Sequence, residues 1–535
     1  MEKTLTLLDT TGIQDYIFGS NRLRENVTAS FLVELATDDW IRALLRAYPQ
    51  GSNRLIFRGG GNVAILFDRA EDAKQVVRDL SRKLLIESPG LQLIAAHHTF
   101  DDTQHALGGA DGVYAQLSRK IRTLGQQRRD VHALAGLGVT RLCRSTGQPA
   151  VGEDQEEPGR PVSAEVAAKT NRRYRNAADR RLYKFLRRGG VTRDLLRRYA
   201  FSRDLDELGR THGESSYIAV VHADGNGMGR RFEALRERYP SAADNDRLLA
   251  EIERFYKALE DAGRQALQRT LLRLIIALDD DPAFADLKRS LALAPDGRPY
   301  LPLRPIVFGG DDVTVVCDGR LGLTFAATYL EEFQSAAANL PDEKPGYACA
   351  GVAIVKTHYP FARAYALSTE LCDASKDLVH AEAVRREPGF DAAALDWHIA
   401  VGGIAAPLSE LRNRLYRVKE GLLTHRPLFR AGIGWESWDA LAKTVGAFDA
   451  SDWRERRNKV MALREALRAG REATRAFRAA YGVDELPLID GVTGDDYRRS
   501  GWLSNRDGLH DVCAYFDAIE ALDFYLPLPS VEVTP

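Results

Sequence analysis

The chain has 535 residues, 44% of them hydrophobic, which is enough for roughly two to four globular domains with buried cores. Its 74 basic and 75 acidic residues nearly balance, which excludes a whole-chain charge argument for nucleic-acid or membrane binding. Five cysteines without CxxC spacing predict no disulfide framework, and no apolar run approaches the roughly 18 residues of a membrane span. We therefore expect a cytoplasmic multidomain protein without membrane contact.

The first predicted elements follow the order strand, helix, hairpin, helix, strand. A short apolar strand ends at Asp9, the run LIFRGGGNVAILFD at 55–68 is typical of two strands joined by a glycine turn, and a further apolar run ends at residue 100. This order matches the ferredoxin-like fold, in which helices lie on a four-stranded antiparallel sheet. We predict such a domain over 1–112.

A mainly helical middle domain is predicted over 113–213. Its stretch 161–200 contains twelve Lys or Arg residues against three acidic ones. Clustered cations favour contact with phosphate groups, although a solvated helix face explains the same pattern. The Pro, Gly and charge content of 147–163 predicts a loop.

The same order of elements returns in 214–400. The run YIAVVHAD ends at Asp224, PIVFGGDDVTVVCD at 305–318 matches the earlier hairpin, and YACAGVAIVKTH at 347–358 supplies the last strand. The repeat predicts a second ferredoxin-like domain and an α+β fold class for the chain.

Three carboxylates of the second copy are expected to meet at one end of its sheet. In this topology the first strand lies beside one arm of the hairpin, so Asp224 would face Asp311 and Asp312. Gathered carboxylates repel one another, and a divalent cation with oxygen ligands relieves the repulsion. We predict two Mg²⁺ or Mn²⁺ ions held by Asp224, Gly225, Asp311 and Asp312, a palm-type site for attack of a 3′-hydroxyl on an α-phosphate. A solvated hairpin and a helix cap at Asp224 are the alternatives.

The nucleotide is expected to lie on glycine-rich backbone beside these carboxylates. Backbone N–H groups at a helix start bind phosphates, and glycines let the chain approach a ligand closely. Lys376 is predicted at the end of a helix, either as a phosphate ligand or as a solvated lysine. The predicted nucleotide-binding residues are Gly225, Asn226, Gly227, Met228, Gly229, Gly309, Gly310 and Lys376.

The first copy lacks most of this site, because Gly61 and Asn62 stand in the places of Asp311 and Asp312. Asp9 alone cannot hold two ions, so we expect this copy to be a structural or nucleotide-binding partner. Its stretch 20–33 could contact a second nucleotide across the domain interface, or it could form ordinary helix surface. The residues concerned are Arg22, Arg24, Glu25 and Ser30.

A helical C-terminal domain is predicted over 401–535. The residues 458–481 have the periodicity of a single amphipathic helix. The pair His510 and Asp511 is also expected in a helix, without partner histidines for an HD nuclease.

Together these motifs resemble those of the large polymerase/cyclase subunit of type III CRISPR effector complexes. The resemblance rests on DTTGIQDYIFGSNRLRENVTASFLV, RGGGN, HADGNGMG, FGGDD, GVAIVKTHYPFARAYALSTELCDASK and LTHRPLF. It implies an inactive first and an active second palm domain packed face to face, a zinc-bearing helical domain between them and a helical C-terminal domain. It further implies synthesis of cyclic oligoadenylate messengers from ATP in antiphage defence, with Asp224, Asp311 and Asp312 binding metal, the loop 225–229 binding triphosphate and Lys376 contacting phosphate.

Three departures from this family stand out. The first palm-like strand starts within ten residues of Met1, so we expect no HD nuclease domain before it. The segment LCRSTGQPA at 142–150 keeps only Cys143 of a zinc ribbon, so we expect no structural zinc. Asn226 stands where many relatives have Asp, and no clear serine in the predicted helix over 251–267 would read an adenine, which leaves the base open.

Three functional hypotheses follow. The first is a nucleotidyltransferase/cyclase that joins nucleoside triphosphates, with ATP as the leading candidate, and makes a cyclic oligonucleotide. The second is an RNA-binding scaffold subunit that contacts CRISPR RNA, target RNA and small effector subunits and whose cyclase activity is regulated by RNA. The third is a stand-alone defence cyclase controlled by a phage signal or by self-association.

Overall fold

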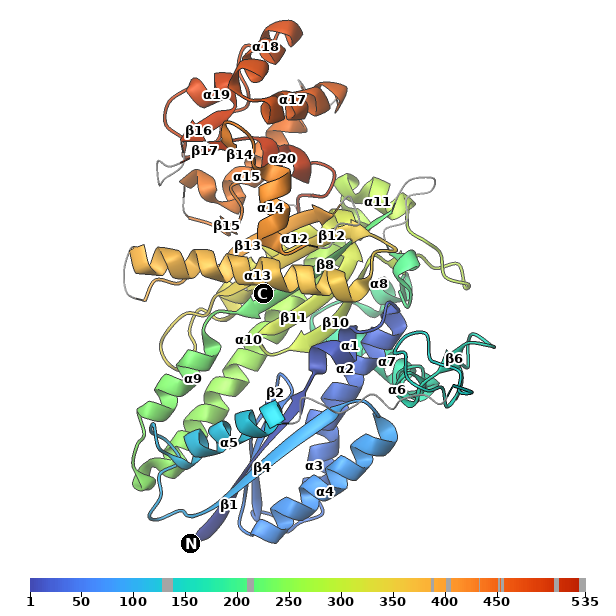
Figure 1. The fold of residues 1–535 in the computed structure, drawn as a ribbon, viewed down its shortest axis with the longest axis vertical. Coiled ribbons are helices and arrows are strands. Elements are labelled where there is room, and N and C mark those ends of the chain that lie inside the picture. The colour runs from blue at the N-terminus through green and yellow to red at the C-terminus, as the bar shows by residue number, and fades with distance from the viewer. Residues whose placement is uncertain are drawn as a thin grey trace.

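Two sheets with the same core topology form the body of the molecule. The computed structural model describes residues 1–127, 138–208, 216–385, 389–400, 406–432, 434–450, 453, 457–504 and 510–528. The first sheet lies at the N-terminal end, the second follows along the long axis, and the C-terminal helices form the opposite end (Figure 1). The predicted α+β class with two ferredoxin-like units is confirmed.

The first sheet has the strand order β2-β3-β1-β4, and all its neighbouring strands are antiparallel. Its strands are β1 (Glu2–Thr11), β2 (Asn53–Gly59), β3 (Asn62–Phe67) and β4 (Gln92–Asp101). Successive residues of a strand point to opposite faces, so Leu7 belongs to one hydrophobic core and Leu8 to the other. Both faces of this sheet are therefore covered.

The helices on the Leu8 face come from the first copy itself. They are α1 (Ile13–Phe18), α2 (Leu23–Glu34), the π-helix η1 (Leu35–Asp39), α3 (Trp40–Leu45) and α4 (Ala70–Glu87). The opposite face is covered by α5 (Val113–Gln127) and by α10 (Asn245–Asp280).

The second sheet repeats this order as β10-β11-β8-β12 and continues with β13 and β15. Its strands are β8 (Tyr217–Gly225), β10 (Leu303–Gly309), β11 (Asp312–Asp318), β12 (Ala348–Lys356), β13 (Ala394–Ala400) and β15 (Leu428–Phe429). The register shifts between Pro305 and Val307 just as it shifts between Leu55 and Phe57 in the first hairpin. The predicted repeat therefore includes the same shift of strand register in both hairpins.

The helix α10 joins the two sheets. Its 36 residues contact β2 of the first sheet and both β10 and α12 (Gly322–Ala336) of the second. The helix α13 (Phe361–Arg385) crosses the other face of the second sheet (Figure 1). Arg54 Nε donates to Glu253 Oε1 at 2.7 Å, which ties β2 to α10.

The middle segment is partly helical. The helices α6 (Ala164–Lys169) and α7 (Arg172–Arg188) pack against α2, while α5 packs on β1 and β4. The predicted loop 147–163 contains a short hairpin of β5 (Gly152–Glu153) and β6 (Pro161–Val162). All five cysteines of the chain, including Cys143, are free and buried. The domain limits proposed from the sequence remain predictions.

Several short elements connect these units. They are α8 (Arg193–Arg197), β7 (Ala200–Phe201), η2 (Leu205–Glu207), α9 (Met228–Glu237), η3 (Ala242–Asp244), η4 (Pro282–Phe284), α11 (Ala285–Arg289), β9 (Tyr300–Leu301) and η5 (Gly319–Leu321).

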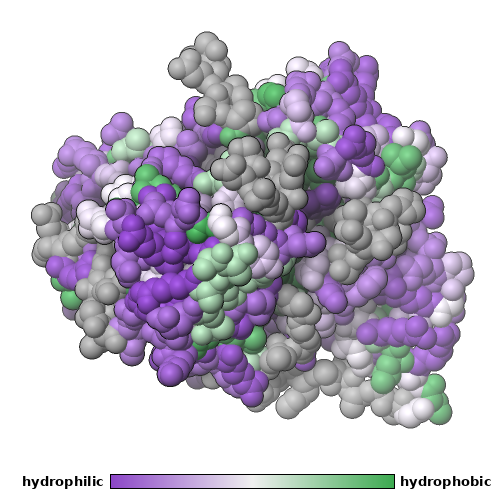
Figure 2. Space-filling model, turned by 90° about the horizontal axis from the view of Figure 1, so that it is seen from above, coloured by the Kyte–Doolittle hydropathy of each residue, from purple (hydrophilic) through white to green (hydrophobic). Residues whose placement is uncertain are grey.

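The C-terminal part combines helices with a small sheet of order β14-β17-β16. Its elements are α14 (Leu408–Tyr416), β14 (Gly421–Leu422), η6 (Gly434–Glu436), α15 (Trp438–Phe448), α17 (Arg457–Ala469), α18 (Arg471–Tyr481), α19 (Asp496–Ser500), β16 (Trp502–Ser504), β17 (Asp511–Cys513) and α20 (Phe516–Ala521). Seen from this end, the surface is mainly hydrophilic with scattered hydrophobic residues (Figure 2).

Two predictions for this part were wrong. The single helix expected over 458–481 is broken at Gly470, whose φ of 109° is incompatible with an α-helix. Asp511 begins a strand rather than lying in a helix, because it pairs with Gly421 and Ser504 in the small sheet. Its carboxylate also accepts from Arg471 at 2.5 Å, which fixes the start of the strand. In the part of the chain that the structure describes, no helix is both long and apolar enough to span a membrane.

Candidate active site

The turn of the second hairpin carries two adjacent, half-buried aspartates beside the end of β8. Gly309 pairs with Asp312 and closes a two-residue turn of Gly310 and Asp311. Gly310 has a φ of 80°, whereas Asp311 has a negative φ. This combination is the one that type II′ hairpin turns require, with glycine at the first central position. The sequence thus places a carboxylate at the tip and another at the start of β11.

Asp224 is the penultimate residue of β8, which lies between the hairpin and β12. The register pairs Val313 with Ala223 and Cys349 with Asp224, so Asp224 and Asp312 follow on neighbouring strands. Lys376 lies inside α13, rather than at a helix end as predicted, and its ammonium forms an ion pair with Asp224. Burial alone would lower the pKa of Lys376, but the charge of Asp224 outweighs it and raises that pKa. The structure therefore places Asp224, Asp312 and Lys376 together.

Asp311 packs against the backbone of β8. A Cβ atom added to Gly225 would lie 2.8 Å from both Cβ and Oδ2 of Asp311, so only glycine leaves room for this carboxyl group. Burial and the nearby charge of Asp224 raise the pKa of Asp311 to about 7. The three predicted carboxylates therefore influence one another electrostatically.

The surroundings of Asp312 likewise make its negatively charged form unfavourable. Its side chain is 42% exposed, yet its Oδ1 atom is buried and has no hydrogen-bond partner among the described residues. Burial and the charge of Asp224 raise its pKa to about 7. His222 Nδ1 lies 3.5 Å from this oxygen and 3.3 Å from Thr314 Oγ1, and burial lowers the pKa of the imidazole. Sequence reasoning missed His222, although it precedes Asp224 by two residues on the same face of β8.

This donor set fits a hard divalent cation. Asp312 offers an unpartnered oxygen, and two neighbouring carboxyl groups have raised pKa values that a bound cation would lower again. Among the residues that the structure describes, no three His, Cys, Asp or Glu side chains are arranged as a ready metal site. The Lys376 ammonium instead supplies the positive charge beside Asp224.

The glycine loop after Asp224 leads into α9. Gly227 has a φ of 62° and caps the helix, and a side chain at Gly229 would meet open space. Asn226 does not face the carboxylates, because its Nδ2 donates to Asp391 Oδ1 at 2.7 Å and to Ala392 O at 2.9 Å. The loop thus keeps its helix N-terminus accessible, while the side chain of Asn226 anchors the segment before β13.

The first copy has a different turn. Gly60 and Gly61 have φ values of 54° and 83°, the pattern of a type I′ turn. A Cβ at Gly61 would lie 2.0 Å from Ile13 Cδ1 and 2.4 Å from Thr10 Oγ1, so no aspartate fits there as one does at 311. Asp9 pairs with Asn62 across β1 and β3, as the repeat predicts. The register matches the second copy, but the turn does not hold two carboxylates.

The helix α10 supports both turns, and sequence reasoning missed this role. A Cβ at Gly263 would lie 1.7 Å from Gly310 O, so the helix backbone touches the second turn. A Cβ at Gly59 would lie 1.5 Å from Tyr256 Oη, so the tyrosine packs on the first turn. Gly263 and Tyr256 lie on a periodic helix without any motif that marks them.

A cavity of about 980 Å³ lies between the two hairpin turns. Its walls include both glycine turns, Asp312, Tyr256 and one side of α7. The volume is at the upper end of the about 300–1,000 Å³ of ligand pockets. Of the three site aspartates, Asp312 lines this cavity, which therefore has room for a nucleotide beside Asp312.

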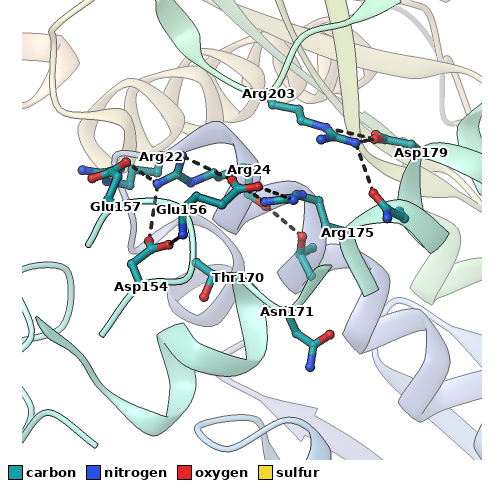
Figure 3. A network of polar contacts seen from close by, with 12 residues as sticks. Arg22, Arg24, Asp154, Glu156, Glu157, Thr170, Asn171, Arg175, Asp179 and Arg203 are labelled. Carbon is teal, nitrogen blue, oxygen red and sulfur yellow. Dashed lines mark hydrogen bonds and ion pairs between the residues drawn. The ribbon is translucent and has the colours of Figure 1, made fainter. Parts of the chain in front are cut away.

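The two arginines at the start of α2 have acidic partners within the chain. Arg22 and Arg24 both form ion pairs with Glu157, and Glu156 also accepts from Arg175 at 2.5 Å (Figure 3). Glu25 is buried and accepts from Arg160 at 2.7 Å. Ser30 alone of the four predicted residues lines the cavity. The acidic residues Asp154, Glu156 and Glu157 thus neutralise the cations that we expected to meet a nucleotide.

Two family models match the chain. The model of the Cas10/Cmr2 second palm domain matches residues 217–384, and the model of Csm1 subunit domain B matches residues 3–128. These ranges contain the two ferredoxin-like units, with the aspartate site in the first-named match. Each ferredoxin-like unit of the chain is thus similar to a domain of Cas10/Csm1 proteins. The resemblance to the large subunit of type III CRISPR effector complexes is thereby confirmed.

Solved Csm1 structures are similar to this chain, and the match with the higher TM-score indicates the same fold. The Csm1-Csm4 cassette in complex with pppApA matches with a TM-score of 0.51 and 13% identity, over 97% of this chain and 69% of that chain. The Csm1 structure from T.onnurineus matches with a TM-score of 0.47 and 15% identity, over 98% of this chain and 69% of that chain. A search of curated proteins gave no match.

Proposed function

We propose that this chain is a metal-dependent nucleotidyltransferase that joins nucleoside triphosphates into a cyclic oligonucleotide, with ATP as substrate. The observation that carries the proposal is the convergence of Asp224, Asp311 and Asp312, two of which have a pKa raised to about 7. Carboxyl groups with pKa values raised in this way are typical of functional sites. Related Csm1-Csm4 cassettes have been solved with ATP, with pppApA and with the cyclic products cA3 and cA4, which supports this substrate class.

In this reaction the 3′-hydroxyl of one nucleotide attacks the α-phosphorus of another, a P–O bond forms, and pyrophosphate leaves with the bond electrons. Asp224, Asp311 and Asp312, with the backbone at Gly225, would hold Mg²⁺ or Mn²⁺. Such ions supply Lewis-acid stabilisation of the phosphates and of the leaving pyrophosphate when bound. In this proposal the backbone N–H groups of 227–229 at the start of α9 would hold the triphosphate. The N–H of Asn226 already donates to Tyr347 O at 2.9 Å.

Lys376 has a second role in this proposal. Its ammonium pairs with Asp224 in the structure. A cation bound between the aspartates would compete with Lys376 for that carboxylate, which frees the ammonium to bind a phosphate oxygen. During substrate binding, the Lys376 ammonium would thus leave the Asp224 carboxylate and bind a phosphate oxygen instead.

Labelled nucleoside triphosphates test the proposal. The purified chain, incubated with Mg²⁺ or Mn²⁺, should release pyrophosphate and form oligonucleotides, whereas the Asp311→Asn, Asp312→Asn variant should lose at least about 100-fold in rate. Asp296→Asn is a matched control, because Asp296 lies in an exposed loop and pairs with Arg298. Equal rates in the double variant and the wild type would refute the site assignment.

A scaffold function in a CRISPR complex is the second candidate. The solved Csm1 chains that match this fold include cassettes with Csm4, which favours a similar small protein as partner. Co-purification of RNA, with binding that weakens steeply as salt rises, would support this function. An active chain that elutes alone or as a homo-oligomer, without RNA, would instead support a stand-alone cyclase.

A further inference from the structure

Three cations of α7 face the cavity between the two turns. Arg180, Lys184 and Arg188 are exposed, and all three line the cavity. Their spacing of four residues places them on one side of the helix, one turn apart. We call them the cationic stripe. They belong to the basic stretch 161–200, for which the sequence left phosphate binding and solvation open.

The other cations around the cavity already have partners. Arg58 pairs with Asp38 at 2.6 Å and with Glu260 at 3.7 Å. Arg181 pairs with Glu34 and donates to Phe308 O at 3.1 Å. The cationic stripe differs from them, because none of its three members has an ion pair or hydrogen bond with another described residue.

The acidic residues of the cavity do not neutralise the cationic stripe. Asp15, Asp39 and Asp312 line the same cavity, but none forms an ion pair with α7. Asp15 and Asp39 come from the first copy, and Asp312 belongs to the aspartate site. Like charges at a spacing of four residues destabilise a helix by about 0.2–0.5 kcal/mol per pair. Repulsion within the cationic stripe therefore destabilises α7 slightly, and a bound polyanion would offset this effect.

We propose that the cationic stripe of Arg180, Lys184 and Arg188 binds the 5′-triphosphate of a nucleotide held between the two palms. The inference rests on the proposed function, since it places the substrate or a linear intermediate of that reaction in this cavity. Both sources carry the same triphosphate, which clustered cations recognise. The stripe acts in binding and makes no bond to the reacting atoms.

Binding without turnover tests this proposal. The chain is titrated with ATP, adenosine, pppApA and ApA in the presence of EDTA, which stops metal-dependent chemistry. In the Arg180→Gln, Lys184→Gln, Arg188→Gln variant, the affinity for ATP, for pppApA or for both should fall at least about tenfold. The affinities for adenosine and ApA should not change, and the salt dependence of triphosphate binding should become weaker.

A matched variant removes three other arginines. Arg172, Arg173 and Arg193 are exposed on α7 and α8 but do not line the cavity, so their replacement by Gln should leave triphosphate affinity unchanged. If the triple stripe variant does not fold, the three single variants replace it, with an expected loss of about twofold to fivefold each. Circular dichroism and thermal unfolding report folding in each case.

The ligands separate the possible outcomes. A loss for ATP assigns the stripe to the substrate, and a loss for pppApA alone assigns it to the linear intermediate. Unchanged affinity for both, or an equal loss in the matched variant, overturns the proposal. So does a variant that loses affinity only for a single-stranded RNA with a 5′-hydroxyl. The Asp311→Asn, Asp312→Asn variant should still bind triphosphates in EDTA, so failure of the proposed chemistry would leave this result intact.

Discussion

At the scale of single residues, the site holds two aspartates whose negatively charged form is unfavourable. Asp311 and Asp312 each have a pKa raised to about 7 by burial and by Asp224, whereas an aspartate in an unfolded chain has a pKa of about 3.9. A raised folded-state pKa favours the native state below about pH 4, and this contribution is lost as the pH rises to about 7. The metal-free protein therefore loses stability over this range.

Asp312→Asn should remove part of this loss. In EDTA at about pH 8 the variant should unfold about 1–2 °C above the wild type, and at about pH 5 the difference should shrink. This corresponds to about 1 kcal/mol, because the 42% exposure of Asp312 reduces the effect through solvent screening. Thermal unfolding at both pH values measures it, with Asp296→Asn as control. A variant no more stable than the wild type at the higher pH would contradict the electrostatic explanation.

The sequence predicted the residues that carry motifs and missed those that act through packing. Asp224, Asp311 and Asp312 could be placed together because topology fixes which strands are neighbours. His222 was missed because its neighbour Thr314 lies 92 positions away along the chain. Gly263 was missed for a similar reason, since its contact with Gly310 depends on where a long helix crosses the sheet.

At the scale of elements, α10 determines the position of the aspartate turn. Gly263→Ala would place a methyl group 1.7 Å from Gly310 O, and backbone on both sides cannot move cheaply. We expect product formation to fall at least about tenfold while the overall fold persists. Gly446→Ala in α15 is the control, because a Cβ there meets nothing within 4 Å and should stabilise the helix by about 0.5–1 kcal/mol. Normal activity of Gly263→Ala would show that α10 does not fix the turn.

The first hairpin cannot be restored by adding carboxylates. In Gly61→Asp, Asn62→Asp the new side chain at 61 would collide with Ile13 and Thr10, and it would need the left-handed backbone that Gly61 has. The double variant should therefore be less stable by about 1–3 kcal/mol and no more active than the wild type. Activity assays in the Asp311→Asn, Asp312→Asn background provide the test. New metal-dependent product formation there would contradict this interpretation.

Element boundaries were predicted less well than element order. The repeat of strand, helix, hairpin, helix and strand appears in both sheets as expected. The helix break at Gly470 was not predicted, because it follows from a positive φ. The strand at Asp511 was not predicted either, because it depends on pairing with Gly421, ninety residues earlier. Local periodicity contains neither kind of information.

At the scale of the whole molecule, one chain brings two unequal palms to the same cavity. The first supplies a glycine turn without aspartates, the second supplies Asp312 of the aspartate site, and α7 and α10 close the sides. The sequence predicted the pair and its inequality from Gly61 and Asn62. It did not predict that the basic stretch of the middle segment would line the space between them, because that contact joins residues far apart in the chain.

Mass spectrometry of the products formed from a mixture of the four nucleoside triphosphates is the decisive measurement. With Mg²⁺ or Mn²⁺, the wild type should yield pyrophosphate and cyclic oligonucleotides built from adenosine, and the Asp311→Asn, Asp312→Asn variant should yield none. If RNA or a partner protein is needed, the same products should appear once it is added. Products of equal yield from the double variant, or no nucleotidyl transfer by the wild type with metal, RNA and partner present, would contradict the proposed enzyme.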